Sequence, residues 1–552
     1  MRERWDHWLA RAWSVAIVTL YALRGFLPHL LREDWQHGDL YQHVWWTHRF
    51  ADPELFPGDL YYDFFSRSLF APLGYQAIYR LFVPVFGSET VAEVLPFVLA
   101  AILTVLVFAL GRRAANGADF GGVAAVTVLS VSQFLPMYVG QGLPRYFAMP
   151  ILALFVWALG GERRLAVGGS FLAGALFYPP VVVVMALAFL IYAGPALLRD
   201  RREWRRWLGA AVPVVLAAGI LLAVYGRPQP AGIGPKVTVE VARSMAEFVD
   251  GGRSAFFVSD RWDYWFANFR SGIGIGQIKV FGFAIVVLIA SLTFRRLLPR
   301  EVWPLLAGGL AAFFLAHWTL FALHLPNRYA KVTIHLFFVI FAGALAERLR
   351  GWLAATVLGR YVGRRAVAVL ALALLVGLGI VAGKRLHRDL TAPVEGSRMA
   401  TLHYLEGLPK ETLVAAHPRD ADPVPMVARR SVLASEETAL PYWLGYYRRV
   451  SERIEASLDA LLATRWEEVD ALQTRFGVDV FLVNLACFSE TGWHYAEPFD
   501  SRMLERFQRG RQEGFVLFNP PEDRILFRAG DWMVVRVGPD REVARARDLH
   551  RG

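Results

Sequence analysis

Acidic and aromatic residues alternate in the segment 32–68, which directly follows the first hydrophobic run of the chain. The first candidate for chemistry in this segment is Asp39, because Gly38 permits a close backbone approach and Tyr41 and His43 stand beside it. A carboxylate next to an apolar, low-dielectric region and other acids can gain basicity or hold a divalent cation. Asp39 is therefore predicted to act as a base or as a metal ligand.

Further acids lie in the same segment. Asp34, with Glu33 beside it, is the second candidate for the catalytic acid, because it lies where the hydrophobic run ends. Asp59 and Glu33 are candidates to line a substrate site together with Tyr41 and His43. The same acids also fit a solvated loop in which no single carboxylate has a function, and the sequence leaves open which of them is the base.

Two junctions combine Pro, Arg and Tyr directly before a hydrophobic run. The first, 142–146, contains Arg145, and the second, 324–329, contains Arg328, with Lys331 one turn further along. A guanidinium can bind a phosphate through two hydrogen bonds, and a helix N-terminus adds partial positive charge. The pattern predicts a phosphate site. Arg and Tyr at a membrane interface also contact lipid headgroups without any specific ligand, so both interpretations stay open.

A second long polar stretch, 226–272, begins in a Gly- and Pro-rich segment. It contains Asp263 between Trp262 and Tyr264, and Asp263 is a further candidate to line the substrate site. The stretch fits either a flap over a substrate or an ordinary connector. The chain has no Walker A, HExxH, CxxC or G-x-S-x-G motif, so the sequence offers no support for those enzyme classes.

Long hydrophobic runs must position these residues. The 552-residue chain is 55% hydrophobic and 19% charged, with a mean hydropathy of +0.35, whereas soluble domains carry about 25% charged residues. The chain is therefore predicted to be an α-helical polytopic membrane protein with eleven crossings. Proline residues at 179 and 180 divide one apolar stretch into two short paired helices. The predicted crossings are 12–31, 91–110, 120–139, 146–160, 165–177, 181–198, 207–225, 273–294, 302–323, 330–346 and 366–383.

The distribution of Lys and Arg predicts the orientation. Loops assigned to the inside carry these residues at about three times the density of loops assigned to the outside. This places the N-terminus in the cytoplasm and the loops 32–90 and 226–272 outside. The segment 69–87 is predicted to lie on the outer surface as an amphipathic helix. The net charge of +11 is thus a sign of topology, and no nucleic acid partner is expected.

The composition changes near Arg385 to that of a soluble α/β domain. We therefore divide the chain into a membrane domain, 1–383, and an outer domain, 384–552. Short β-like runs alternate there with helical periodicity at 451–463 and 466–475. The predicted strands are 412–416, 478–483, 514–518, 525–528 and 532–537.

Five predicted features together form a recognisable architecture. They are an inside N-terminus, an acidic first outer loop, the amphipathic helix after it, the short paired helices and an outer α/β domain. In these features the chain resembles the GT-C superfamily of polytopic membrane glycosyltransferases, which use polyprenyl-phosphate-linked sugars. The resemblance implies an inverting transfer of a sugar to an acceptor hydroxyl on the outer face of a bacterial-type inner or plasma membrane. The acceptor would be a glycan, a lipid or a protein.

The resemblance also implies roles for the candidate residues. Asp39, or Asp34 in its place, would deprotonate the acceptor hydroxyl. Arg328, Arg145 and Lys331 would neutralise the leaving phosphate. A divalent cation, Mg²⁺ or Mn²⁺, could bridge Asp39 and that phosphate.

Two other classes compete with the enzyme. A flippase or exporter of lipid-linked sugars would bind the same phosphate without catalysing a reaction. A scaffold for envelope assembly would need neither phosphate binding nor catalysis. A transporter would place charges at mid-membrane and show two related halves. Here the candidate charges gather on one side and no duplication is visible, which favours the enzyme.

Overall fold

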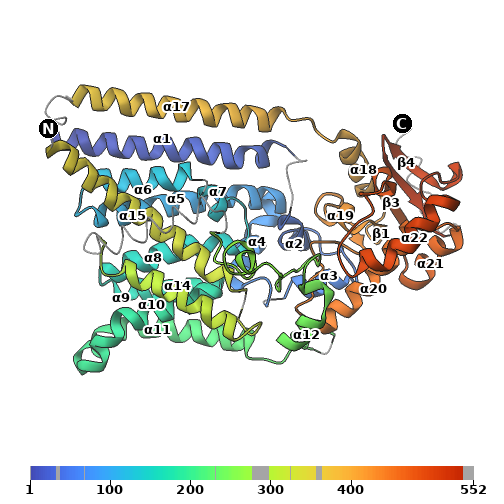
Figure 1. Ribbon diagram of the computed structural model, residues 1–552, viewed down its shortest axis with the longest axis horizontal. Helices are drawn as coiled ribbons and strands as arrows, with labels where there is room; N and C mark the ends of the chain where they lie inside the picture. Colours follow the sequence, from blue (N-terminus) through green and yellow to red (C-terminus); the bar gives the residue numbers. More distant parts are fainter. Residues whose placement is uncertain are drawn as a thin grey trace.

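The structure is a computed structural model, and it divides visibly into two ends. Long helices lie roughly parallel to one another at one end, and a small sheet with its own helices lies at the other (Figure 1). The residues that it describes are 2–32, 38–67, 69–132, 134–230, 232–275, 298–323, 325–355 and 364–538.

Five described helices are long and apolar enough to cross a bilayer, namely Ala10–Leu31, Ser88–Ala114, Pro180–Arg199, Trp204–Tyr225 and Asn327–Trp352. Shorter apolar helices accompany them. The predicted membrane character therefore agrees with the structure, whereas the count of eleven crossings is not confirmed. The predicted crossing 273–294 lies largely outside the described residues, and the predicted crossing 120–139 is divided between α6 and α7. The helices of this part are α1 (Arg2–Leu31), α5 (Ser88–Ala114), α6 (Asp119–Val131), α7 (Phe134–Val139), α8 (Ala148–Gly160), α9 (Arg164–Phe177), α10 (Pro180–Arg199), α11 (Arg201–Tyr225), α14 (Val302–Trp318), α15 (Asn327–Ala355) and α17 (Arg364–Thr391).

The break between α9 and α10 follows the prediction. Helix α9 ends at Phe177, and α10 begins with Pro180 in its first turn, where a missing backbone N–H costs no helical hydrogen bond. The two helices are in contact. Proline thus ends one helix and starts the next, as expected.

Helix α4 (Leu73–Phe86) occupies the segment predicted to lie on the membrane surface. Its 14 residues span about 21 Å at about 1.5 Å per residue, which is too short for a hydrocarbon core of about 30 Å. Tyr75 and Tyr79 are buried against the protein, while Leu81 and Val85 are exposed. An apolar face turned outward on a helix too short to span fits a surface position.

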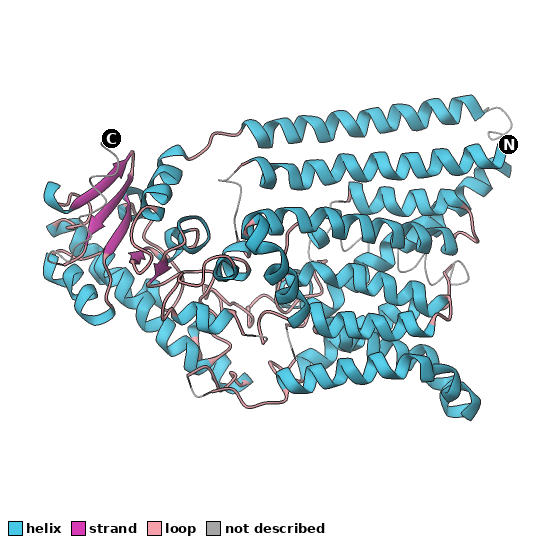
Figure 2. Ribbon diagram, turned by 180° about the vertical axis from the view of Figure 1, so that it is seen from behind, coloured by secondary structure: helices cyan, strands magenta, loops and turns pink. Residues whose placement is uncertain are grey.

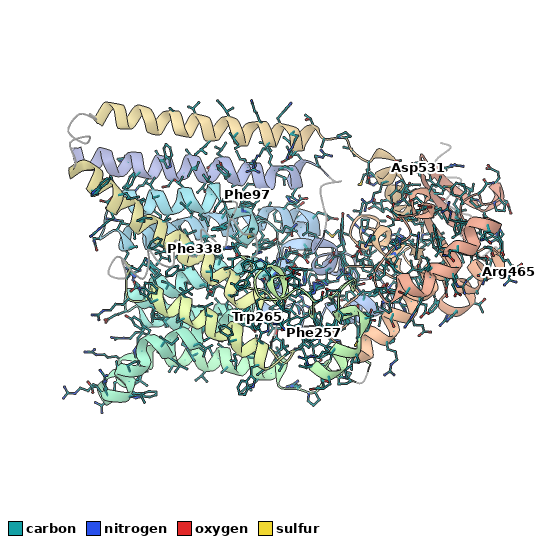
Figure 3. All side chains as sticks on the ribbon, viewed as in Figure 1. Phe97, Phe257, Trp265, Phe338, Arg465 and Asp531 are labelled. Carbon is teal, nitrogen blue, oxygen red and sulfur yellow. The ribbon has the colours of Figure 1, made fainter. Side chains whose placement is uncertain are left out.

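The loops after α1 and α11 form short helices between the two ends of the molecule. The first loop contains α2 (Leu40–His43), η2 (Trp45–Phe50) and α3 (Leu60–Phe65). The second contains α12 (Val239–Ser244), η4 (Ala246–Phe248) and η5 (Asp263–Ala267). Figure 3 labels Phe257 and Trp265 in this second loop, between the helices and the outer domain, with Arg465 at the far end of that domain.

The outer domain is built on a five-stranded sheet with strand order β2-β1-β3-β5-β4 (Figure 2). Strand β1 runs parallel to β2 and β3, and β5 runs antiparallel to β3 and β4. The strands are β1 (Leu413–Ala416), β2 (Ser431–Val432), β3 (Val480–Asn484), β4 (Ile525–Ala529) and β5 (Trp532–Arg536). The helical elements are α18 (Gly396–Glu406), α19 (Pro418–Ala421), η7 (Val424–Ala428), α20 (Leu444–Leu461), α21 (Trp466–Phe476), η8 (Leu485–Phe488), α22 (Phe499–Glu513) and η9 (Glu522–Arg524).

Four of the predicted strands and both predicted helices of this domain are present. The predicted strand 514–518 is wrong. Its apolar residues form a turn, in which the backbone N–H of Val516 donates to the carbonyl of Ala463 at 3.0 Å. The run is apolar because Leu517 is buried, and it makes no strand ladder.

Direct contacts hold the first loop to the outer domain. The hydroxyl of Tyr61 donates to the carbonyl of Leu433 at 2.7 Å, and the rings of Phe64 and Tyr446 stack with centroids 3.6 Å apart. Nζ of Lys410 lies 2.7 Å from a carboxylate oxygen of Asp52. The outer domain is therefore packed on the segment that contains Asp39.

Candidate active site at the junction of the loops and the outer domain

Asp39 forms an ion pair with Arg145. The carboxylate lies at the start of α2, and the backbone carbonyl of Asp39 accepts hydrogen bonds from the N–H groups of Gln42 and His43. Burial disfavours the charge of Asp39, but Arg145, His43 and Arg328 outweigh it and hold the pKa of Asp39 below its usual value. Asp39 is thus ionised and held in place by a guanidinium.

The position of Arg145 follows from close packing just before it in the chain. Arg145 belongs to η3 (Pro144–Phe147), which begins with proline. The hydroxyl of Tyr79 on α4 donates to the carbonyl of Gly142 at 2.7 Å. A Cβ at Gly142 would lie 2.5 Å from the Cα of Ala92 on α5. Helices α4 and α5 therefore pack tightly against the backbone just before Arg145 and fix the position of this residue.

Arg328 and Lys331 lie in the first turns of α15. Asn327, at the start of this helix, donates its side-chain amide to the carbonyl of Gly272 at 2.7 Å, so the second loop holds the helix end. The charges of Arg328 and Arg145 both act on Lys331. The two predicted junctions, distant in the sequence, thus meet at Asp39.

Arg328 has no carboxylate within ion-pair distance in the part of the chain that the structure describes, and the same is true of Lys331. Within the described part of the chain, the Nε atom of Arg328 is buried and has no hydrogen-bond partner. Its charge nevertheless acts on Asp39 and on Tyr178. A buried N–H donor without a partner is costly, so this arrangement suits an anionic ligand.

His43 lies beside the ion pair, at the end of α2. Burial lowers its pKa to about 4, despite the opposing charge of Asp39. The imidazole is therefore neutral at neutral pH, and it can donate or accept a hydrogen bond without adding charge.

Glu437 of the outer domain also faces this site, and nothing in the sequence pointed to it. The side-chain amide of Gln42 donates to the backbone carbonyl of Glu437 at 2.5 Å. The carboxylate lies 3.4 Å from a guanidinium nitrogen of Arg253, which comes from the second loop. Burial is the main cause that raises the pKa of Glu437, and the charge of Asp39 adds to it. The charge of Asp39 thus acts on a carboxylate from the other end of the chain.

The remaining predicted residues are placed differently. Asp59 is buried and caps α3, where it accepts the backbone N–H groups of Tyr61 and Tyr62 at 2.7 and 2.9 Å. Tyr41 is buried in the core. Asp263 begins η5, and its carbonyl accepts the N–H of Asn268. Glu33 and Asp34 lie outside the described residues.

Potential metal ligands gather elsewhere. Among the residues that the structure describes, three side chains with suitable atoms come together in the outer domain, at His417, Asp420 and Cys487. No such group of three forms at Asp39 within the same described ranges. The Mg²⁺ or Mn²⁺ expected at Asp39 would find there a carboxylate that is already paired with Arg145.

Comparison with known proteins gives structural relatives only. No family model matches the chain, and no curated protein sequence matches it. Among solved structures, the chain is similar to structures of an archaeal oligosaccharyltransferase. The apo form from Archaeoglobus fulgidus is 12% identical, with a TM-score of 0.48, over 87% of this chain and 71% of that one.

Two further structures of that oligosaccharyltransferase are also similar. The complex of AglB with an inhibitory peptide and a dolichol-phosphate is 13% identical, with a TM-score of 0.48, over 87% of this chain and 70% of that one. The complex with Zn and sulfate is 13% identical, with a TM-score of 0.43, over 86% and 68%. At such identities and scores the likeness concerns the arrangement of the chain alone.

Proposed function

We propose that the chain is a membrane glycosyltransferase that moves a sugar from a polyprenyl-phosphate-linked donor to an acceptor hydroxyl, with inversion at the anomeric carbon. The observation that supports this most is the cluster of Arg145, Arg328 and Lys331 beside the carboxylate of Asp39. The buried, unpartnered Nε of Arg328 points to an anion as the missing component.

The cations suit the leaving group of such a transfer. As the bond between the anomeric carbon and the phosphate oxygen breaks, the electron pair stays on the phosphate, so negative charge grows there. Arg328 and Lys331 would stabilise this charge, and Arg145 would do so while held by Asp39. Donors that already occupy their positions lose no energy to reorganisation at the moment of transfer.

The proton of the acceptor hydroxyl needs a base. The sequence indicated Asp39, but a carboxylate paired with a guanidinium and with a lowered pKa is a weak base. Glu437 is held nearby and has a raised pKa. We propose that Glu437 accepts the proton of the acceptor hydroxyl. Asp39 would position Arg145 and the attacking hydroxyl. The transfer proposed here uses protein side chains alone. Binding of Mg²⁺ or Mn²⁺ at Asp39 is a separate, additional proposal.

The orientation completes the proposal. The start of α5 lies against the first loop, because the hydroxyl of Thr47 donates to that of Ser88 at 2.8 Å. Arg112 and Arg113 lie in the last turn of α5, at the opposite end of that helix. This agrees with a cytoplasmic N-terminus and an extracytoplasmic outer domain, in a bacterial-type inner or plasma membrane.

The test is a transfer assay with the full chain reconstituted in nanodiscs and supplied with a radiolabelled polyprenyl-phosphate sugar and an acceptor mixture. We expect release of free polyprenyl phosphate together with a labelled acceptor. If vesicles instead move the intact lipid-linked sugar between leaflets, without release of phosphate, the chain is a flippase and the enzymatic proposal fails.

A further inference from the structure

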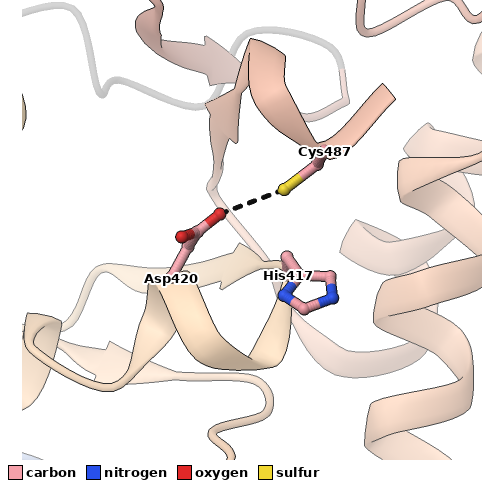
Figure 4. Close-up of side chains that lie close together, drawn as sticks. All are labelled: His417, Asp420 and Cys487. Atoms are coloured by element: carbon pink, nitrogen blue, oxygen red, sulfur yellow. Dashed lines mark hydrogen bonds between the residues drawn. The ribbon is translucent and has the colours of Figure 1, made fainter. Parts of the chain in front are cut away.

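Three potential metal ligands converge at one edge of the sheet in the outer domain. His417 directly follows β1, Asp420 lies in α19 after it, and Cys487 lies in η8 directly after β3. Strands β1 and β3 are parallel neighbours, so their carboxyl ends open at the same edge, which is where α/β sheets commonly bind ligands. A ring nitrogen, a carboxylate oxygen and Sγ lie within 4.8 Å of one another (Figure 4).

The three side chains are shielded from solvent to different degrees. His417 is 3% exposed and Cys487 is 4% exposed, while Asp420 is partly buried. This separates the cluster from the acids that decorate an ordinary surface. The shielded thiol donates to Asp420 Oδ2 at 3.2 Å. Nδ1 of His417 accepts the N–H of Arg419 at 3.3 Å, and Asn484 donates to Asp420 Oδ1 at 3.5 Å. The two bonds donated by nitrogen, at 3.3 and 3.5 Å, are longer than the usual range of about 2.7–3.2 Å, so they do not fully satisfy His417 and Asp420.

We propose that His417, Asp420 and Cys487 bind a zinc ion. One imidazole nitrogen, one carboxylate oxygen and one thiolate form a mixed N, O and S set, which suits Zn²⁺, whereas Mg²⁺ and Ca²⁺ prefer oxygen ligands alone. This site lies in the outer domain and is independent of the transfer reaction proposed above.

Charge supports the assignment. A thiol releases its proton to solvent when it binds a metal, and the thiolate sulfur of Cys487 would then be the ligand. The two negative ligands, Cys487 and Asp420, would balance the charge of one Zn²⁺. Three protein ligands leave a fourth position for water or another ligand.

Metal analysis of the purified full-length chain tests the site. After incubation with ZnCl₂ and desalting, we expect about one zinc per chain, and a large loss of zinc in His417→Ala and Cys487→Ser. His494→Ala is the matched control, because His494 is an imidazole of the same domain that pairs with Asp500 instead, and it should keep its zinc. No retained zinc in the unmodified chain, or equal zinc in all four proteins, would overturn the proposal.

A second measurement needs no variant, which guards against misfolding. Cys487 is the only cysteine of the chain, so alkylation by N-ethylmaleimide reports on this thiol alone. Zinc-loaded protein should be modified more slowly than protein stripped with EDTA, and zinc should restore the slow rate. Alkylation rates that do not respond to zinc would show that Cys487 is no ligand.

Discussion

Gln42 donates its side-chain amide to the backbone carbonyl of Glu437 at 2.5 Å. Gln42 lies in the helix that begins next to Asp39, and Glu437 belongs to the outer domain. This single hydrogen bond therefore joins the first loop to the outer domain at the candidate site. The site is incomplete until the two ends of the chain have docked, which means that the outer domain is part of the catalytic machinery proposed here.

Substitution of Arg328 tests the phosphate site. Arg328→Ala should weaken binding of the lipid-linked donor by about 2–5 kcal/mol, because a desolvated phosphate would lose its partner. Arg328→Lys should recover only part of the affinity, because an ammonium lacks the two-pronged geometry of a guanidinium. Donor binding is measured by lipid competition in nanodiscs. An alanine variant that binds as tightly as the parent would remove Arg328 from the site.

Asp39→Asn keeps the size of the side chain but removes its charge and its ion pair with Arg145. We expect turnover to fall by roughly 10²-fold while donor affinity changes little, because Arg145 and the attacking hydroxyl would lose their positioning. Asp523→Asn is the matched control, since Asp523 is exposed in η9 of the outer domain, and it should be nearly as active as the parent. A fully active Asp39→Asn protein would contradict the proposed mechanism.

Glu437→Gln tests whether Glu437 accepts the proton of the acceptor hydroxyl. Because the pKa of Glu437 is raised, activity should fall on the acid side at a higher pH than an ordinary glutamate would give. The Gln variant should lose roughly 10²–10⁴-fold in turnover together with this acid limb. Glu436→Gln, which alters the neighbouring partner of Arg253, should keep the limb. A profile that is unchanged in Glu437→Gln would return the role of base to Asp39.

Asp422 predicts a pH-dependent stability. Burial raises its pKa to about 8 from a usual value near 3.8, although Glu437 N–H and Ser435 Oγ donate to it. The folded chain therefore holds an extra proton between about pH 4 and pH 8, and its stability should decrease as the pH rises through that window. Asp422→Asn should flatten this slope in thermal unfolding, whereas Glu490→Gln, at an exposed position, should leave it in place. A slope unchanged by Asp422→Asn would refute the assignment.

The orientation is tested by labelling cysteines introduced at Ser66 and Ser501 in a Cys487→Ser background. We expect both to react with a membrane-impermeant maleimide in intact spheroplasts, because the first loop and the outer domain face outward in the proposed topology. If either cysteine reacts only after the membrane is permeabilised, the proposed orientation is wrong.

The sequence predicts local features well, and it misses contacts that depend on docking. Arg145 and Arg328 were predicted because each follows a proline at the start of a helix, which is a local signal. Glu437 was not predicted, because its closeness to Asp39 arises only when the outer domain packs on the first loop. The mistaken strand at 514–518 has a similar cause, since its apolar residues are buried by tertiary packing rather than by strand pairing.

The tight packing at Gly142 limits what can replace it. A methyl group there would meet Ala92 of α5 and the hydroxyl of Tyr79, neither of which can yield without moving a helix. Any larger residue would push apart the two helices that present Arg145, three positions along the chain. Related chains that conserve the ion pair with Asp39 should therefore retain glycine at this position, even though Gly142 contacts no substrate in the proposed reaction.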